Sequence, residues 1–123
     1  MDTIIVSRHP AAIEFIARQL GGQTATHQGK QCIEIDVTHP DDIGTPEHYA
    51  CQLIPIVAQA TAADVRGKHI YGNLPLHLAA LAAKVTVVEF DGAPPRGQEY
   101  SLEDMQAAGA VLRTYVVHGR STL

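Results

Sequence analysis

Short apolar runs alternate with helix-type segments along this 123-residue chain. Residues 4–6 are apolar and residues 85–90 are rich in β-branched side chains, so both runs predict buried strands. Residues 31–37 alternate between apolar and polar side chains, which predicts a half-buried strand. Residues 68–71 predict a fourth, shorter strand.

Apolar side chains at helical spacing predict helices between and after these strands. The first helix is expected over 10–20, with Pro10 at its first position, and the second over 46–60, where Pro55 would kink or split it. A third is expected over 76–83, again with a proline, Pro75, at its start. The last opens at residues 101–104 with a capping-box pattern and continues to about residue 116, with Met105, Ala108, Leu112 and Val116 as its buried stripe.

The order of these elements predicts an α/β fold. Strands that alternate with helices are typical of a Rossmann-like, mainly parallel sheet flanked by helices. The length fits a single domain, expected over residues 1–118, with a flexible tail over 119–123. In sheets of this kind the ligand binds outside the C-terminal ends of the strands.

Net charge and composition limit the kinds of partner that this protein is expected to bind. The net charge of −4 argues against duplex nucleic acid, because a phosphate backbone requires a basic face. A small anion can still be held by a helix N-terminus and one or two arginines. No apolar run approaches the roughly 20 residues of a membrane span, and the first residues do not resemble a signal peptide, so we expect a cytoplasmic protein without a membrane partner. The two cysteines lack zinc-type spacing, and no metal or other cofactor is expected.

Two turns share one arrangement of an apolar strand, a short polar turn, a proline and a helix. They are Ser7-Arg8-His9-Pro10 and Gly72-Asn73-Leu74-Pro75. Each presents free backbone N–H groups and the positive end of a helix dipole at the end of a strand, which favours an anion. Each turn alone is also compatible with an ordinary strand-to-helix connection. Together, on neighbouring strand ends, they predict one phosphate-binding site.

The side chains in these turns suit that role. Ser7 offers a hydroxyl, Arg8 a forked cation that matches phosphate, and His9 an acid or base near neutral pH. Gly72 permits close backbone approach, and Asn73 adds a donor and an acceptor.

Three further polar residues are candidates with competing interpretations. His39, beside Asp41 and Asp42, forms either an acid–base or metal group or a plain polar turn. Asp91 follows the strand over 85–90, where acidic residues often meet ribose hydroxyls, but it also fits a turn. His77 lies one helical turn from the predicted site and either reaches the ligand or stays at the surface.

The stretch over residues 7–14, directly after the first strand, resembles a small CRISPR-associated ancillary family of type III systems. Weaker matches follow in Thr38-His39 with Asp42-Ile43, in Gly72 to Pro75 with Leu78-Ala79-Ala80, and in the helix start at residues 101–105. The resemblance implies a CARF-like fold and membership of the ring nucleases. These are homodimers that bind cyclic oligoadenylate second messengers, chiefly cyclic tetra-adenylate, and linearise them, which switches off type III CRISPR signalling.

The resemblance also implies the site residues and the chemistry. Ser7, Arg8 and His9 match the catalytic motif, and Gly72, Asn73 and Pro75 match the second, ligand-binding motif, with Leu74 between them. In a metal-independent reaction the ribose 2′-oxygen attacks the adjacent phosphorus and leaves a 2′,3′-cyclic phosphate and a 5′-hydroxyl. Arg8 would stabilise the phosphoryl charge, and His9 would be the general base or acid.

Two other interpretations fit the same residues. The protein could be a sensor or sponge that binds the messenger without cutting it. It could also be a nucleotide- or phosphate-handling enzyme outside CRISPR biology.

Overall fold

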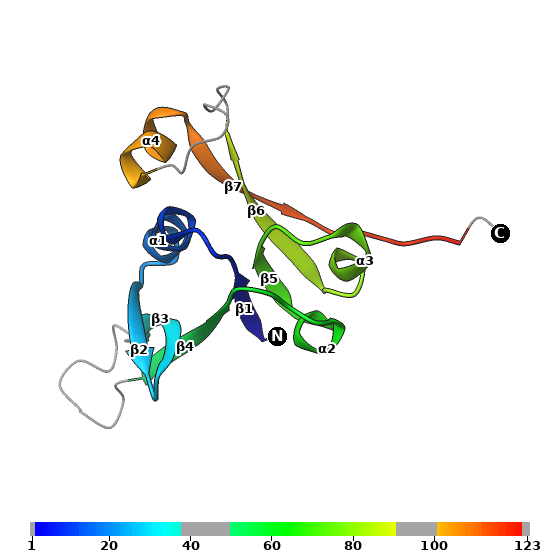
Figure 1. Ribbon diagram of the computed structural model, residues 1–123, viewed down its shortest axis with the longest axis horizontal. Helices are drawn as coiled ribbons and strands as arrows, with labels where there is room; N and C mark the ends of the chain where they lie inside the picture. Colours follow the sequence, from blue (N-terminus) through cyan, green and yellow to red (C-terminus); the bar gives the residue numbers. More distant parts are fainter. Residues whose placement is uncertain (1, 38–49, 91–100, 122–123) are drawn as a thin grey trace.

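A computed structural model of the chain describes residues 2–37, 50–90 and 101–121. Its strands form one seven-stranded sheet in the order β2-β3-β4-β1-β5-β6-β7 (Figure 1). The strands are β1 (Thr3–Val6), β2 (Gln23–His27), β3 (Lys30–Val37), β4 (Ala50–Val57), β5 (His69–Gly72), β6 (Lys84–Phe90) and β7 (Ala110–Tyr115). The helices are α1 (Pro10–Gln19), α2 (Ala62–Val65), α3 (Leu76–Ala79) and α4 (Leu102–Ala107).

The sheet is mixed. The four central strands β4, β1, β5 and β6 run parallel, whereas β2 and β3 on one side and β7 on the other add antiparallel pairings. The expected α/β class, with helices flanking a sheet, is confirmed. The expectation of a mainly parallel sheet is wrong, because the antiparallel pairings equal the parallel ones in number and are longer. Antiparallel partners need only a tight turn between them, which Gln28 and Gly29 supply between β2 and β3, whereas β6 and β7 are joined through helix α4.

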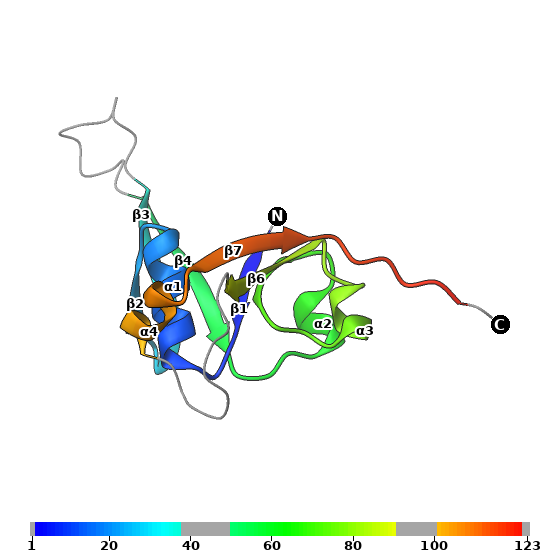
Figure 2. The ribbon, with the colours of Figure 1, turned by 90° about the horizontal axis from the view of Figure 1, so that it is seen from above.

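The helices divide between the two faces of the sheet, which Figures 1 and 2 show from two directions. On one face Ile16 and Ala17 of α1 pack on the sheet residues Ile5, Ile33 and Ile54. On the other face Val65 of α2 and Ala79 of α3 pack on Ile4, Val6, Ile70 and Val85. Neighbouring residues of β1 therefore supply opposite cores, as the twofold period of a strand requires.

The hairpin of β2 and β3 was not predicted as such. Its strand over 30–37 agrees with the predicted strand over 31–37, but β2 was missed. Gln28 and Gly29 connect the strands, and their φ angles of 53° and 76° suit the two-residue turn that a twisted hairpin prefers.

The helix predicted over 46–60 is wrong where the structure describes it, since residues 50–57 form β4. Ile54 is buried beneath α1, whereas Leu53 and Pro55 on the other face are exposed, so the segment has the period of a strand. Pro55, predicted to kink or split a helix, lies within β4; it lacks the N–H that a helix interior needs. Residues 46–49 lie outside the described residues.

The last predicted helix ends early. Helix α4 stops at Ala107, and Gly109, with a φ of 74°, turns the chain into β7, which pairs with β6. Val116, predicted to be buried, has an exposed fraction of 61%. Glycine in the left-handed region is a common helix stop, and β-branched residues after it favour a strand.

Candidate functional site

The C-terminal ends of the parallel strands β1, β4 and β5 lie side by side, along the edge of the sheet where these strands end. Val6 of β1 pairs with Val57 of β4 on one side and with Gly72 of β5 on the other. The two predicted turns therefore leave neighbouring strands at one edge, as the sequence suggested. Ala58, which follows β4, begins a third connection at this edge.

The Ser7 turn is fixed by its own hydrogen bonds. The Ser7 amide donates to the Val57 carbonyl at 3.0 Å, and the Ser7 Oγ accepts from the His9 amide at 3.2 Å. His9 is the N-cap residue of α1, its side chain makes no capping hydrogen bond, and Pro10 follows. The first turn of the ten-residue helix α1 thus keeps backbone N–H groups without an intrahelical acceptor, beside an exposed arginine and histidine.

The Gly72 turn is built differently from the prediction. Gly72 has a φ of 135°, and a Cβ at this position would lie 2.0 Å from the Val6 carbonyl oxygen, so only glycine fits. Pro75 is the N-cap of α3 and not its first helical residue, and α3 has only four residues. Such a short helix has almost no macrodipole, and the second helix end expected to attract an anion is therefore not formed. Asn73 is exposed, whereas Leu74 packs against the core beneath α2 and α3.

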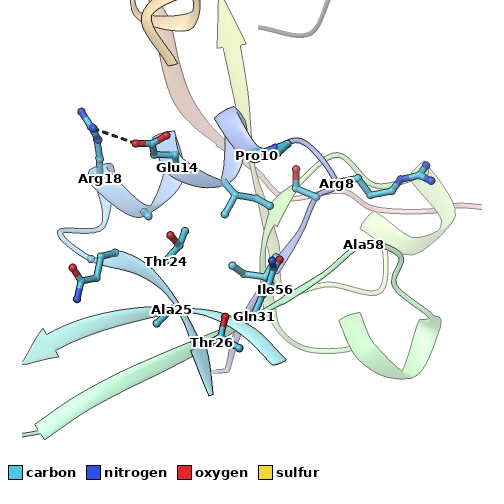
Figure 3. Close-up of a pocket in the computed structure, with 15 residues that line it drawn as sticks. Arg8, Pro10, Glu14, Arg18, Thr24, Ala25, Thr26, Gln31, Ile56 and Ala58 are labelled. Atoms are coloured by element: carbon cyan, nitrogen blue, oxygen red, sulfur yellow. Dashed lines mark hydrogen bonds and ion pairs between the residues drawn. The ribbon is translucent and has the colours of Figure 1, made fainter. Parts of the chain in front are cut away.

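A groove of about 810 Å³ opens beside the Ser7 turn, between α1 and the β2–β3 hairpin (Figure 3). Ser7 and Arg8 line it, together with Ala58 at the end of β4. Its walls further include Pro10, Ile13, Glu14, Ala17 and Arg18 of α1, Gly22, Gln23, Thr24, Ala25, Thr26 and Gln31 of the hairpin, and Ile56 of β4. Neither His9 nor the Gly72 turn lines this groove.

The position of the groove follows from the chain topology. Helix α1 follows β1 and covers one face of the sheet, whereas α2 follows β4 and covers the other. The two connections separate between the ends of β1 and β4, where Ser7 and Ala58 line the groove. Open α/β sheets characteristically bind ligands in the crevice at such a switch point.

Charged side chains lie at both ends of the groove. Arg8 is exposed at one end, with its guanidinium directed away from Thr24, and among the described residues it forms no ion pair (Figure 3). At the other end Arg18 donates to Glu14 over 3.1 Å along α1, with both side chains exposed. Such a surface pair contributes little to stability.

Sequence reasoning missed the polar residues of the hairpin wall. Thr26 pairs with Gln31, and Thr24 pairs with Ile33, which is buried beneath α1, so all three polar side chains face α1. The available signal was the pair of β-branched threonines at 24 and 26 followed by the Gln28-Gly29 turn, which together indicate a hairpin.

Other predicted candidates are not part of this groove. His39 and Asp91 lie outside the described residues. His77 is exposed on α3. Within the described ranges no group of three or more histidine, cysteine or acidic side chains could hold a metal ion, and no helix there is long and apolar enough to cross a bilayer.

A polar network lies toward the opposite edge of the sheet, where β5 begins, and it joins the partly buried His69, the buried Thr86 and the exposed Thr114. The His69 Nε2 lies 2.7 Å from the Thr86 Oγ1, which lies 2.8 Å from the Thr114 Oγ1. Burial, and secondarily the charge of Lys84, lowers the pKa of His69 below its ordinary value of 6.5. Burial also raises the pKa of the neighbouring Tyr71 hydroxyl.

These features define an α/β protein whose mixed sheet carries a polar groove and an amide-rich helix start where its central strands end. Residues 4–118 match a family model described as "Putative CRISPR-associated protein (Cas_VVA1548)". The chain therefore belongs to this family of CRISPR-associated proteins. Neither the curated proteins nor the solved structures contain a significant match to it.

Proposed function

We propose that this CRISPR-associated protein is a ring nuclease that binds and linearises cyclic oligoadenylate, chiefly cyclic tetra-adenylate, and so ends type III CRISPR signalling. We further propose that its fold is a CARF-like variant of the Rossmann-like sheet, in which antiparallel edge strands extend a parallel centre. The membership of the family supports the biological context.

One observation carries the proposal: the pairing of Val6 with both Val57 and Gly72 at the ends of three parallel strands. It brings Ser7, Arg8 and His9 next to the Gly72-Asn73 turn, at the start of the ten-residue helix α1. A phosphodiester at this edge would meet helix amides, a serine hydroxyl and a cation. Arg8 is exposed, and exposed side chains change rotamer within nanoseconds, so its guanidinium can turn toward a bound phosphate.

The reaction needs no nucleophile from the protein. The ribose 2′-oxygen attacks the adjacent phosphorus and gives up its proton to a base, while the bond from phosphorus to the 5′-oxygen breaks. The departing 5′-oxygen takes up a proton from an acid or from water and becomes a hydroxyl. Holding these atoms in line lowers the barrier. Arg8 and the α1 amides would stabilise the charge on the phosphoryl oxygens, and His9 would transfer a proton as general base or acid.

A homodimer is part of the proposal. A cyclic tetranucleotide has twofold symmetry in outline, and two copies of the edge described above would hold equivalent phosphates. Native mass spectrometry should then detect one ring per two chains. One ring per single chain would contradict the dimer but not the binding.

The decisive test of the activity is incubation of the pure protein with labelled cyclic tetra-adenylate in EDTA. We expect linear products that end in a 2′,3′-cyclic phosphate and a 5′-hydroxyl, identified by mass spectrometry. An intact ring after long incubation with excess protein would reject cleavage. Cleavage only when a divalent metal is added would reject the metal-independent mechanism.

The position of His9 supports a second candidate function, namely a sensor or sponge that binds the messenger without cleaving it. Ser7 and Arg8 line the groove but His9 does not, so a ligand in the groove can contact the binding groups without contacting the proposed proton-transfer group. Tight binding of the ring by the wild type without any product would identify this function. A third candidate, a general nucleotide-handling enzyme, requires that a mononucleotide stabilise the protein more than the ring does.

A further inference from the structure

We infer that the groove between α1 and the β2–β3 hairpin is an adenine pocket and that the Gln31 carboxamide reads the edge of the base. This inference rests on the proposed function, because it assumes that the phosphate of the same nucleotide lies at the Ser7 turn. It adds what that function leaves open, namely which residue distinguishes adenine from other bases.

The groove is continuous with the proposed phosphate site. Ser7 and Arg8 form one end of it, and Gln31 lies on the hairpin wall across from α1. Its volume of about 810 Å³ falls within the range of small-molecule sites and exceeds what a single nucleotide fills. A nucleotide whose phosphate lies at Ser7 can therefore extend its base along the groove toward the hairpin.

Backbone register fixes the direction of Gln31. It pairs with Thr26 across the hairpin, and the next residue of the same face, Ile33, is buried beneath α1. Side chains two apart on a strand share a face, so Gln31 must face α1 as well. Figure 3 shows Gln31 on this wall of the groove, between Thr26 and Ile56. Among the described residues no hydrogen bond occupies its carboxamide.

The chemistry of the walls suits a purine. The partly exposed Ile56 offers apolar surface to the face of a planar base, and the buried Ile13 and Ala17 also line the groove. A glutamine carboxamide presents one acceptor and one donor side by side, which match the N6 amino group and the N7 acceptor of adenine. Hypoxanthine replaces the N6 donor with a carbonyl oxygen and presents two acceptors at that edge, so one side of the carboxamide would face a mismatched group.

The experiment measures binding of two rings, cyclic tetra-adenylate and its inosine analogue cyclic tetra-inosinate, in EDTA to the full-length protein. Each Gln31 that contacts the ring should favour adenine about 5- to 150-fold, the equivalent of about 1–3 kcal/mol for one bidentate pair, so the wild-type dimer should prefer the adenine ring by the product of two such factors. Gln31→Leu should bind the adenine ring more weakly by a similar factor and should bind the two rings almost equally. Gln106→Leu, the same change at an exposed position of α4, should keep the wild-type preference.

The outcomes distinguish failure of the proposed function from failure of the adenine pocket. Failure of the wild type to bind either ring rejects the proposed function and this inference with it. Wild-type binding with a preference that survives in Gln31→Leu rejects the adenine pocket alone. Thermal unfolding establishes whether Gln31→Leu is folded. If it is not, Gln31→Met, which keeps the length of the side chain, replaces it, and a wild-type preference for adenine in that variant likewise rejects the pocket.

Discussion

Gly72 is the residue at which backbone conformation most constrains the site. We expect Gly72→Ala to lower the free energy of unfolding by at least about 1–3 kcal/mol, because a φ of 135° strains any L-residue and the added Cβ would meet the Val6 carbonyl oxygen. Chemical denaturation measures the change. Gly29→Ala is the matched control, since Gly29 also has a positive φ of 76° but nothing within 4 Å of the added Cβ. Equal losses in the two variants would show that the close approach to Val6 contributes nothing.

Substitution of Arg8 should mainly weaken ligand binding, whereas substitution of His9 should mainly slow cleavage. Arg8→Ala should weaken binding of cyclic tetra-adenylate about 10- to 150-fold, because a charge-assisted hydrogen bond to phosphate is worth about 1.5–3 kcal/mol. His9→Ala should leave binding within about threefold but slow cleavage by about 10²- to 10⁴-fold, the usual contribution of general acid–base catalysis. Titration calorimetry and single-turnover kinetics measure the two effects.

Exposed residues distant from the groove provide the controls for these variants. Arg66→Ala and His118→Ala make the same chemical changes elsewhere on the surface and should alter neither quantity. Binding that withstands Arg8→Ala would remove the arginine from the site. Cleavage that is unaffected by His9→Ala would remove His9 from the chemistry.

His69 makes stability depend on pH through its lowered pKa. Because the folded state disfavours the charged imidazole, the unfolded state binds more protons near pH 6.5. The stabilisation that neutral His69 contributes is therefore complete above about pH 6.5, the ordinary histidine pKa. It is lost as the pH falls through the lower pKa of His69 in the folded state. His69→Gln should lose less Tm than the wild type between pH 7.5 and pH 5. Parallel Tm curves for the two proteins would contradict this account, and His118→Gln should match the wild type.

At the scale of elements, helix α4 depends on its N-cap residue, Ser101, which precedes Leu102. The Ser101 Oγ accepts from the Asp104 amide at 3.1 Å, and the Asp104 carboxylate accepts from the Ser101 amide at 3.2 Å. Ser101→Ala should therefore cost about 0.5–2 kcal/mol, whereas Ser101→Gly should cost only a few tenths, as is usual for N-cap residues. Urea denaturation of the two variants tests the cap. An alanine variant as stable as the glycine variant would contradict it.

The elements that the sequence predicted well are those set by local patterns. The apolar run of β1, the proline at the start of α1 and the alternation of β3 each define an element without reference to the rest of the chain. The segments over 50–57 and 110–115 were misassigned because their apolar residues also fit helical spacing. Their strand conformation depends on pairing with β3 and β6, and such pairing is not visible in a local window.

At the scale of the whole molecule, the sequence predicted the components of the site better than their arrangement. Ser7 and Gly72 could be placed at strand ends, and the register of β1 with β5 makes those ends neighbours. The groove was not predictable, because it forms only when the β2–β3 hairpin packs beside α1. The missed strand β2 therefore concealed Thr24 and Thr26, and without the hairpin pairing the direction of Gln31 toward α1 was also hidden.

The central claim is that the edge where β1, β4 and β5 end holds the ring. Backbone amide chemical-shift mapping of the wild type during titration with cyclic tetra-adenylate tests it most directly. We predict that the largest shifts fall on Ser7 to His9, on Ala11 and Ala12, on Ala58 and on Gly72 to Asn73. Largest shifts at the opposite edge, around His69 and Thr114, or an unchanged spectrum at saturating ring, would contradict the account.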